Sequence, residues 1–213
     1  AMDGVVSPAF AVTMGKLGGL AVLNLEGLWS RYDDAEAQLD RIAALPKETA
    51  TREMQAIYQE PIKPELLARG VEQIKAGGVL AAASLTPQRV EEHYQTALEA
   101  GLDVLVIQGT VVSAEHVSSK VEPLDLKKFI AECPVPVIVG GVASYATTLH
   151  LMRTGAVGAL IGVGPGHACT TPVGPGIGVP PATANPHAAA ARAQHMLEHG
   201  EYWNVHAAGG TRT

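Results

Sequence analysis

Residues 135–164, VPVIVGGVASYATTLHLMRTGAVGALIGVG, contain one complete repeat of the pattern that decides the fold. The apolar runs at 135–141 and 157–164 each predict a buried strand. Between them, Ser144 and Gly155 have the residue types that begin and end a helix. Neither apolar run alternates with polar residues, which is typical of parallel strands that are covered on both faces. The stretch therefore predicts a strand–helix–strand unit of an α/β fold with a parallel sheet.

The same pattern continues on both sides of this stretch. Helices are predicted before, between and after these strands, at 9–18, 86–101, 124–133 and 187–200. Further strands are predicted at 19–25, 79–84, 103–109 and 201–210. The sequence thus gives about six strands, with a unit recurring about every 25 residues.

Two folds share this pattern: the open doubly wound sheet and the closed (β/α)8 TIM barrel. Glycines follow the predicted strands at 109, 140–141, 162–166 and 209–210. They favour the barrel, because there the carboxyl end of every strand meets one shared site. A closed barrel needs eight strands and typically ~250 residues. We therefore expect residues 1–213 to form a single, incomplete TIM-barrel domain that belongs to a longer protein.

One stretch interrupts the rhythm of strands and helices. Residues 29–75 are polar and have helical patterning, without a buried strand. We interpret them as a helical insertion of two or three helices within the barrel domain. Their charged faces are expected to be solvated.

Composition limits the kinds of partner. The formal net charge is -6, and 17% of the 213 residues are charged. A negative net charge argues against a nucleic-acid or anionic-membrane surface. No run of ~18 apolar residues is present to span a bilayer, and the start lacks the basic segment of a signal peptide. Only Cys133 and Cys169 could form a disulfide, so a reducing cytoplasm is the expected location.

Cys169 has an unusual position for a structural cysteine. It lies in GVGPGHACTTPVG, 162–174, after a predicted strand and among glycines and prolines. Main-chain N–H groups of such a loop can lower the pKa of a thiol and so produce a nucleophilic thiolate. His167, two residues earlier, can act in the same direction or can simply be exposed. An inert cysteine remains the alternative, and glycines that follow strands can bind phosphate or merely make turns.

Several segments, in order, resemble the IMP dehydrogenase/GMP reductase family, and more closely its IMP dehydrogenase-related branch without CBS domains. The resemblance covers nearly all 213 residues. It is carried by AMDGVVSP (1–8), GGLAVLNLEGLWSRY (18–32), VIQGTVVSAEHVSS (106–119), VPVIVGGVAS (135–144), LMRTGAVGALIGVGPGHACTT (151–171) and GVPPATA (178–184).

The resemblance implies a TIM barrel, a homotetramer and an enzyme that acts on purine 5′-monophosphates with NAD or NADP. A cysteine attacks C2 of the purine, and hydride passes between C2 and the nicotinamide. Cys169 matches this nucleophile, and Thr171 matches the threonine that handles water or ammonia. The direction, from IMP to XMP or from GMP to IMP, stays open.

The other site residues also follow from the resemblance. The nucleotide site is expected to include Met2, Asp3, His167, Gly209 and Gly210, with the glycine pair at the phosphate.

The cofactor side is assigned to Gln108, Gly109 and Thr110. The main-chain carbonyls of Gly164, Gly166 and Cys169 match those that bind a potassium ion.

Three positions depart from the family pattern. His167 stands where the family has a phosphate-binding serine, and Ala208 stands where an aspartate holds the ribose hydroxyls. Gln108 replaces the aspartate on the cofactor side of dehydrogenases. Because alanine cannot make the contact that this aspartate makes with the ribose hydroxyls, its presence costs ~1.5–3 kcal/mol of binding free energy. The alternative function is therefore a catalytically impaired relative that binds nucleotides or has a regulatory role.

Overall fold

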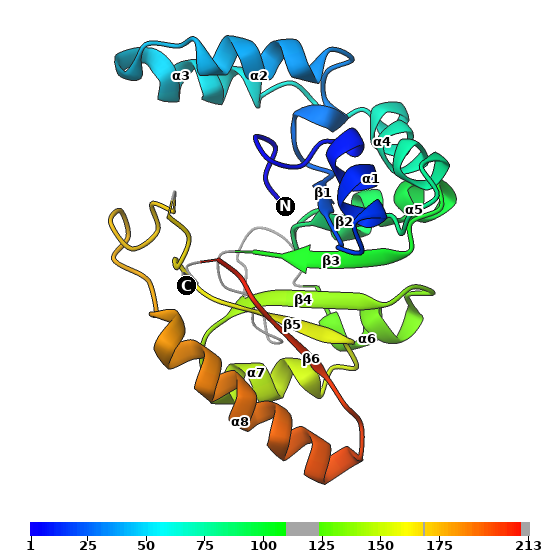
Figure 1. The fold of residues 1–213 in the computed structure, drawn as a ribbon, viewed down its shortest axis with the longest axis vertical. Helices are drawn as coiled ribbons and strands as arrows, with labels where there is room; N and C mark the ends of the chain where they lie inside the picture. Colours follow the sequence, from blue (N-terminus) through cyan, green and yellow to red (C-terminus); the bar gives the residue numbers. More distant parts are fainter. Residues whose placement is uncertain (110–123, 168, 210–213) are drawn as a thin grey trace. The chain divides into compact units, whose positions relative to one another are not determined.

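A computed structural model describes residues 1–109, 124–167 and 169–209. The chain divides into two compact units, residues 1–106 and 107–213, and each is described separately. The strands are β1 (Val22–Asn24), β2 (Ala82–Leu85), β3 (Val104–Gln108), β4 (Val137–Val142), β5 (Gly158–Ile161) and β6 (Asn204–Ala207) (Figure 1). The helices are α1 (Pro8–Lys16), the 3-10 helix η1 (Leu28–Ser30), α2 (Ala35–Ala43), α3 (Lys47–Ile57), α4 (Pro64–Ala76), α5 (Val90–Glu99), α6 (Leu126–Glu132), α7 (Tyr145–Met152) and α8 (Pro181–His199).

The order of the strands distinguishes between the two predicted folds. The six strands form a sheet in which spatial order equals chain order, β1 to β6. β1 pairs with β2 in parallel, as β4 does with β5 and β5 with β6. A doubly wound sheet reverses its strand order at a switch point, whereas a barrel adds each strand to the same side. The α/β fold is thus an incomplete TIM barrel, and this confirms the predicted fold class.

In the first unit, α4 connects β1 to β2 and lies within the predicted insertion, 29–75. It packs against α1 and α5. Its inner face buries apolar side chains, and Gly70 leaves room for Leu23 of β1, since a methyl group there would lie 3.0 Å from Leu23 Cδ2. α2 and α3 instead form a hairpin beside η1, around a separate small core. That core consists of Leu28, Ala35 and Ile57, with Trp29, Tyr32, Leu39 and Ile42 packed against it.

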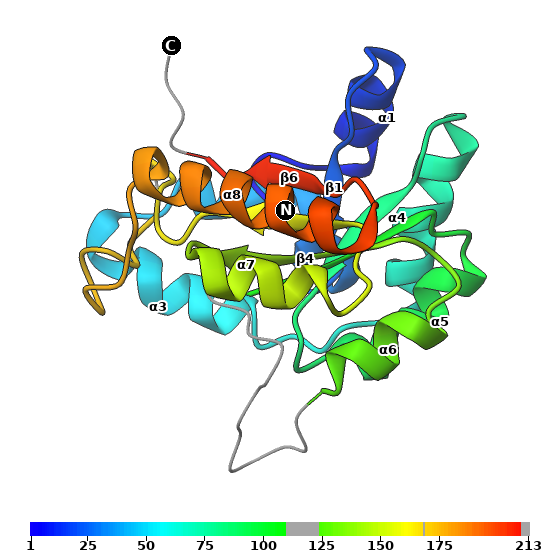
Figure 2. The same cartoon turned by 90° about the horizontal axis from the view of Figure 1, so that it is seen from below.

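In the second unit, α7 and α8 pack against each other and against β5, and α8 also contacts β6 (Figure 2). The helix signals predicted for α7 are present. The Ser144 hydroxyl accepts the Thr147 N–H at 3.2 Å, and Gly155 has a φ of +95°, which favours glycine. None of the helices within the described ranges is long and apolar enough to cross a membrane.

Two predicted helix starts were wrong. α5 begins at Val90 rather than at residue 86, because Thr86 acts through its main chain. The Thr86 carbonyl accepts the N–H groups of Arg89 and Val90, and its own N–H donates to the Glu26 carboxylate.

α8 begins at Pro181 rather than at residue 187. Proline suits the first turn of a helix, where its missing N–H costs no hydrogen bond.

A buried histidine of α8 packs against the segment that leads into β6. His195 is only 3% exposed, and its Nδ1 has no hydrogen-bond partner among the described residues. Its ring meets Trp203 edge-on at 5.3 Å and lies 4.6 Å from the ring of His199. Burial lowers the pKa of His195, and the charge of His199 adds to this effect, while Glu201 and Glu198 oppose it. His195 is therefore neutral at pH 7 in the folded protein.

Acidification should destabilise this unit through His195. The unfolded chain takes up a proton on this side chain near the ordinary pKa of histidine, about 6.5, before the folded chain does. The stabilisation is complete above that pH and is lost as the pH falls through it towards the lower folded-state pKa. Urea unfolding of the full-length protein between about pH 7.5 and pH 5.5 should show a falling midpoint in wild type and a smaller fall in His195→Gln. His150→Gln, on an exposed side chain, is the control; equal pH dependence in both variants would contradict the prediction.

Candidate functional site

The carboxyl ends of β4, β5 and β6 lie next to one another. The Gly162 N–H donates to the Val142 carbonyl at 2.8 Å, so the pairing of β4 and β5 reaches their last residues. The Ala208 N–H donates to the Ile161 carbonyl at 2.8 Å, and this extends the pairing of β5 with β6. Loops that follow these strands therefore start from one edge of the sheet, where barrel enzymes place their sites.

The loop after β5 closes on itself. It leaves the sheet after Val163 and returns at Val179, whose N–H donates to the Val163 carbonyl at 3.0 Å. Inside the loop, the Pro172 ring packs on Gly164 and Gly178. A methyl group at position 164 would lie 2.6 Å from Pro172 Cγ, and one at 178 would lie 3.0 Å from it. These contacts make Pro172 a support of the loop, and no local pattern in the sequence indicates them.

Cys169 is exposed on this loop, and its neighbours favour the thiolate. Its N–H donates to the Gly166 carbonyl at 3.1 Å, which fixes the main chain. Its Sγ lies 3.4 Å from Thr171 Oγ1. Hydrogen bonds from the Thr171 hydroxyl, and then from the Thr171 N–H, lower the pKa of Cys169, against a smaller opposing effect of burial. An exposed thiol with a lowered pKa is the kind that reacts as a nucleophile.

Gly166 connects Cys169 to the end of β6. A methyl group at position 166 would lie 3.7 Å from Cys169 Cβ, and one at position 209 would lie 3.4 Å from Gly166 Cα. Gly209 also has a φ of +78°, a conformation that other residues adopt at a cost. The structure therefore brings Cys169, Gly166 and Gly209 together at one edge. Gly210, its predicted partner at the phosphate, lies outside the described residues.

The remaining predicted residues of the second unit are placed as follows. His167 is exposed on the turn before Cys169, but the hydrogen bonds that lower the thiol pKa come from Thr171. Gly109 follows β3, where its N–H donates to the Gly140 carbonyl at 2.9 Å and its carbonyl accepts the Gly141 N–H at 3.0 Å. Gln108 is partly buried at the end of the same strand.

Thr110 lies outside the described residues. The described residues contain no group of three or more His, Cys, Asp or Glu side chains arranged to hold a metal ion.

Two predicted residues belong to the first unit. Met2 is 54% exposed, and its carbonyl accepts the N–H groups of Val5 and Val6 at 3.0 and 2.9 Å. Asp3 is buried, and its carboxylate accepts hydrogen bonds from the Leu28 N–H and the Tyr58 hydroxyl. The contact with Tyr58, 55 residues away in the sequence, was not foreseen from the sequence.

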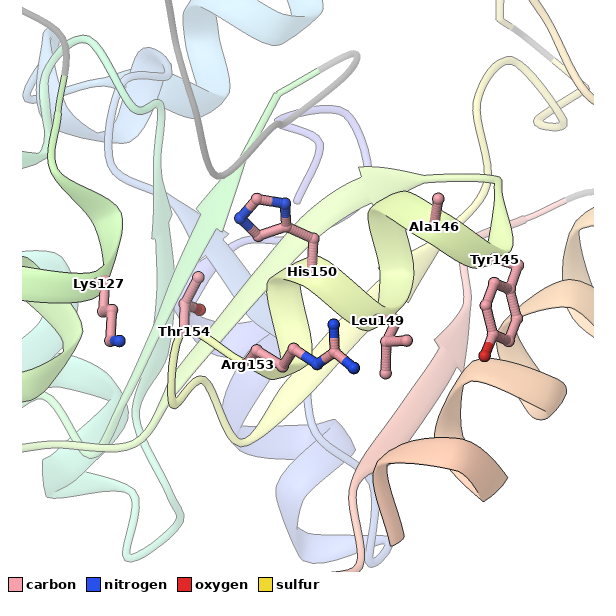
Figure 3. A pocket seen from close by; sticks show the side chains of 7 residues that line it. All are labelled: Lys127, Tyr145, Ala146, Leu149, His150, Arg153 and Thr154. Carbon is pink, nitrogen blue, oxygen red and sulfur yellow. The ribbon is translucent and has the colours of Figure 1, made fainter. Parts of the chain in front are cut away.

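A pocket of about 430 Å³ lies elsewhere in the second unit, between α6 and α7 (Figure 3). None of the predicted site residues lines it. Its lining side chains come from α6, α7 and the turn after α7 rather than from the carboxyl ends of strands: Lys127, Tyr145, Ala146, Leu149, His150, Arg153 and Thr154. In barrel enzymes the chemistry sits at the strand ends, so this pocket is not the candidate active site.

The chain is similar to known proteins over nearly its whole length. Residues 1–213 match the IMP dehydrogenase / GMP reductase domain. An uncharacterized oxidoreductase of Mycolicibacterium smegmatis is 48% identical over 93% of this chain and 54% of that protein. One from Mycobacterium tuberculosis is 46% identical over 99% of this chain and 58% of that protein. The chain thus spans about half the length of the curated relatives it matches.

A solved structure also matches. The crystal structure of an IMP dehydrogenase/GMP reductase-like protein from Corynebacterium glutamicum superposes with a TM-score of 0.91 at 41% identity. The match covers 99% of this chain and 56% of the other.

The Thr171 hydroxyl can be tested by the reactivity of the thiol. Thr171→Val removes the first cause of the lowered pKa, so alkylation of Cys169 by iodoacetamide near neutral pH should slow by about threefold or more. The midpoint of its pH–rate profile should move to higher pH. Peptide mass spectrometry separates Cys169 from Cys133.

Thr170→Val is the matched control, because it changes the neighbouring threonine and leaves the Thr171 hydroxyl in place. Equal alkylation rates in the two variants would mean that Thr171 does not control the thiol.

Proposed function

Because the chain belongs to the IMP dehydrogenase/GMP reductase family, we propose that it carries the cysteine-bearing half of a purine nucleotide oxidoreductase. Its substrate is a purine 5′-monophosphate, IMP or GMP. Cys169 is the nucleophile that attacks C2 of the purine. The family membership also supports a cytoplasmic homotetramer.

One observation carries the proposal: the loop of Cys169 and the turn of Gly209 meet at Gly166. A purine ring and its 5′-phosphate lie at opposite ends of one nucleotide, so a site for both needs two contacts at the same edge of the barrel. The exposed sulfur of Cys169 can reach the ring, while main-chain N–H groups at the glycine turn can bind the phosphate. Proximity of the two segments is what holds C2 near the sulfur.

The residues of this chain perform a defined part of the reaction. The Cys169 thiolate adds to C2, and the π electron pair of the C2–N3 double bond moves onto N3, which takes up a proton. In the oxidative direction, hydride then leaves C2, and water releases the product and restores the thiol. In the reductive direction, the 2-amino group leaves as ammonia, hydride arrives at C2, and the C2–sulfur bond then breaks to release the product and the thiolate. The Thr171 hydroxyl, 3.4 Å from the sulfur, can orient the water or ammonia.

A nicotinamide cofactor, NAD or NADP, accepts or donates this hydride when bound. Gln108, Gly109 and Thr110 are proposed to lie on its side of the site. The N–H and the carbonyl of Gly109 already form hydrogen bonds within the sheet. Gly109 can therefore let the cofactor approach the main chain closely, but its N–H is not available to donate to the cofactor.

A potassium ion would be held by the carbonyls of Gly164, Gly166 and Cys169. The Gly166 carbonyl accepts one N–H and keeps a second lone pair for a cation.

A second candidate is a relative that binds nucleotides without turnover. Ala208 favours it, since alanine cannot form the charge-assisted contacts that an aspartate makes with ribose hydroxyls. His167 favours it as well, because imidazole replaces the serine hydroxyl expected at the phosphate. The Asp3 carboxylate is buried and already accepts hydrogen bonds from the Tyr58 hydroxyl and the Leu28 N–H, so it is not proposed as a ligand of the ribose hydroxyls.

Turnover distinguishes the two candidates. The full-length protein should change the absorbance of the reduced nicotinamide when it is given IMP with the oxidised cofactor or GMP with the reduced one. Cys169→Ala should reduce kcat by at least about a thousandfold, because no other group can form the bond to C2. Cys133→Ala, which changes the only other cysteine, should keep wild-type activity. Nucleotide binding without turnover, unaffected by Cys169→Ala, would support the binding relative instead.

The phosphate site can be tested separately from catalysis. Gly209→Ala places a methyl group against Gly166 and adds the cost of a positive φ, so the Kd for IMP or GMP should rise by about tenfold. Gly176→Ala is the matched control, since Gly176 has a φ of +73° and open space around its Cα. If both variants weaken binding equally, the strain and not the contact between Gly209 and Gly166 is responsible.

A further inference from the structure

The carboxylate of Asp3 is the most constrained charged group of the first unit. The residue is 7% exposed. Its Oδ2 accepts hydrogen bonds from the Tyr58 hydroxyl at 2.6 Å and from the Leu28 N–H at 3.1 Å. Its Oδ1 is buried without a hydrogen-bond partner among the described residues. A carboxylate in this environment depends strongly on the donors that it has, because burial without them is costly.

The Asp3 carboxylate lies directly against the main chain of Gly27. A methyl group at position 27 would lie 1.9 Å from Asp3 Oδ1. Glycine is therefore required at position 27 if Asp3 keeps its place. The carboxylate is confined between the Gly27 main chain and the Tyr58 ring.

The Tyr58 hydroxyl stays protonated and donates a hydrogen bond to Asp3. The side chain is 37% exposed, but its hydroxyl is turned to the buried carboxylate. Burial raises the pKa of Tyr58, and the hydrogen bond to Asp3 and its negative charge raise it further, while Arg31 opposes them. The hydroxyl therefore keeps its proton at every physiological pH. The hydrogen bond from a phenol to a carboxylate is of the strong, charge-assisted kind.

The end of the α2–α3 hairpin that carries Tyr58 is held in place independently of Asp3. The Tyr32 hydroxyl donates to the Ile57 carbonyl at 2.8 Å. The Arg31 guanidinium donates to the carbonyls of Glu60 and Glu26. These hydrogen bonds hold the main chain around Tyr58 in place, so the Tyr58 hydroxyl can in turn restrain Asp3.

The restrained group is part of a tight turn. The Met2 carbonyl accepts the N–H groups of Val5 and Val6, so residues 2–6 form one local unit with Asp3 inside it. The Met2 side chain is exposed on this turn. A hydrogen bond that fixes Asp3 therefore also fixes the direction in which Met2 is presented.

We propose that Tyr58 is a positioning residue for the nucleotide site: through Asp3 it holds the Met2–Val6 turn in the conformation that contacts the purine nucleotide. This assigns a role to the α2–α3 hairpin that the proposed function leaves unused. The inference rests on the proposed function, since Met2 meets a nucleotide only if the chain binds a purine 5′-monophosphate in the way that the family resemblance implies.

The test compares two tyrosines of the same region in the full-length protein. Tyr58→Phe removes the donor to Asp3 and keeps the ring, and Tyr32→Phe removes a hydroxyl that bonds to the Ile57 carbonyl instead. The readouts are the Kd for IMP and GMP, the split between KM and kcat, the Tm, and hydrogen exchange at the Val5 and Val6 amides. Tyr58→Phe should raise the nucleotide Kd and KM by about tenfold and change kcat by less than about twofold.

Hydrogen exchange at the Val5 and Val6 amides separates a positioning role of Tyr58 from a general loss of stability. Tyr58→Phe should speed exchange at Val5 and Val6, while Tyr32→Phe should leave it unchanged even if its Tm falls as far. If wild type binds nucleotide and both variants bind it equally well, the positioning role is overturned and the proposed function stands. If wild type binds neither IMP nor GMP, the proposed function is overturned, and the positioning role is overturned with it.

Discussion

The close approach of the main chains at Gly166 and Gly209 holds the cysteine loop beside the end of β6. A methyl group at position 209 would lie in van der Waals contact with Gly166 Cα, at 3.4 Å, and the φ of +78° at Gly209 favours glycine there. The parallel pairing of β5 and β6 brings the two segments to one edge, and the glycines let them approach there. This proximity is what supports the proposal that an exposed thiol and a turn of main-chain amides belong to one nucleotide site.

In the first unit, the constraint is the burial of a carboxylate, that of Asp3. A buried carboxylate is stable only where donors meet it, and Asp3 receives those donors from two segments far along the chain. The same hydrogen bonds that satisfy Asp3 restrict the turn that begins at Met2. A helical hairpin that has its own small core can thus affect a turn at the start of the chain without contributing a ligand.

The parts of the fold that depend on local signals were predictable from the sequence. Unbroken apolar runs gave the six parallel strands, and Ser144 and Gly155 marked the limits of α7. Thr86 was misinterpreted, since its N–H is used by Glu26, 60 residues away. Contacts of this range follow from packing and not from local pattern, which is why the bond between Asp3 and Tyr58 was also missed.

At the candidate site, the sequence pointed to Cys169 and Gly209 as candidates, but it did not indicate the contacts around them. The effect of Thr171 on the thiol needs the 3.4 Å separation of two side chains, and the packing of Pro172 needs the closed loop.

The most direct measurement of the central claim is covalent trapping with a purine 5′-monophosphate that carries chlorine at C2. The Cys169 sulfur should displace chloride and form a stable bond to C2, so peptide mass spectrometry of the full-length protein should find the nucleotide on Cys169 and a large excess of IMP should prevent it. Labelling of Cys133 instead, or labelling of Cys169 that IMP does not slow, would contradict the account.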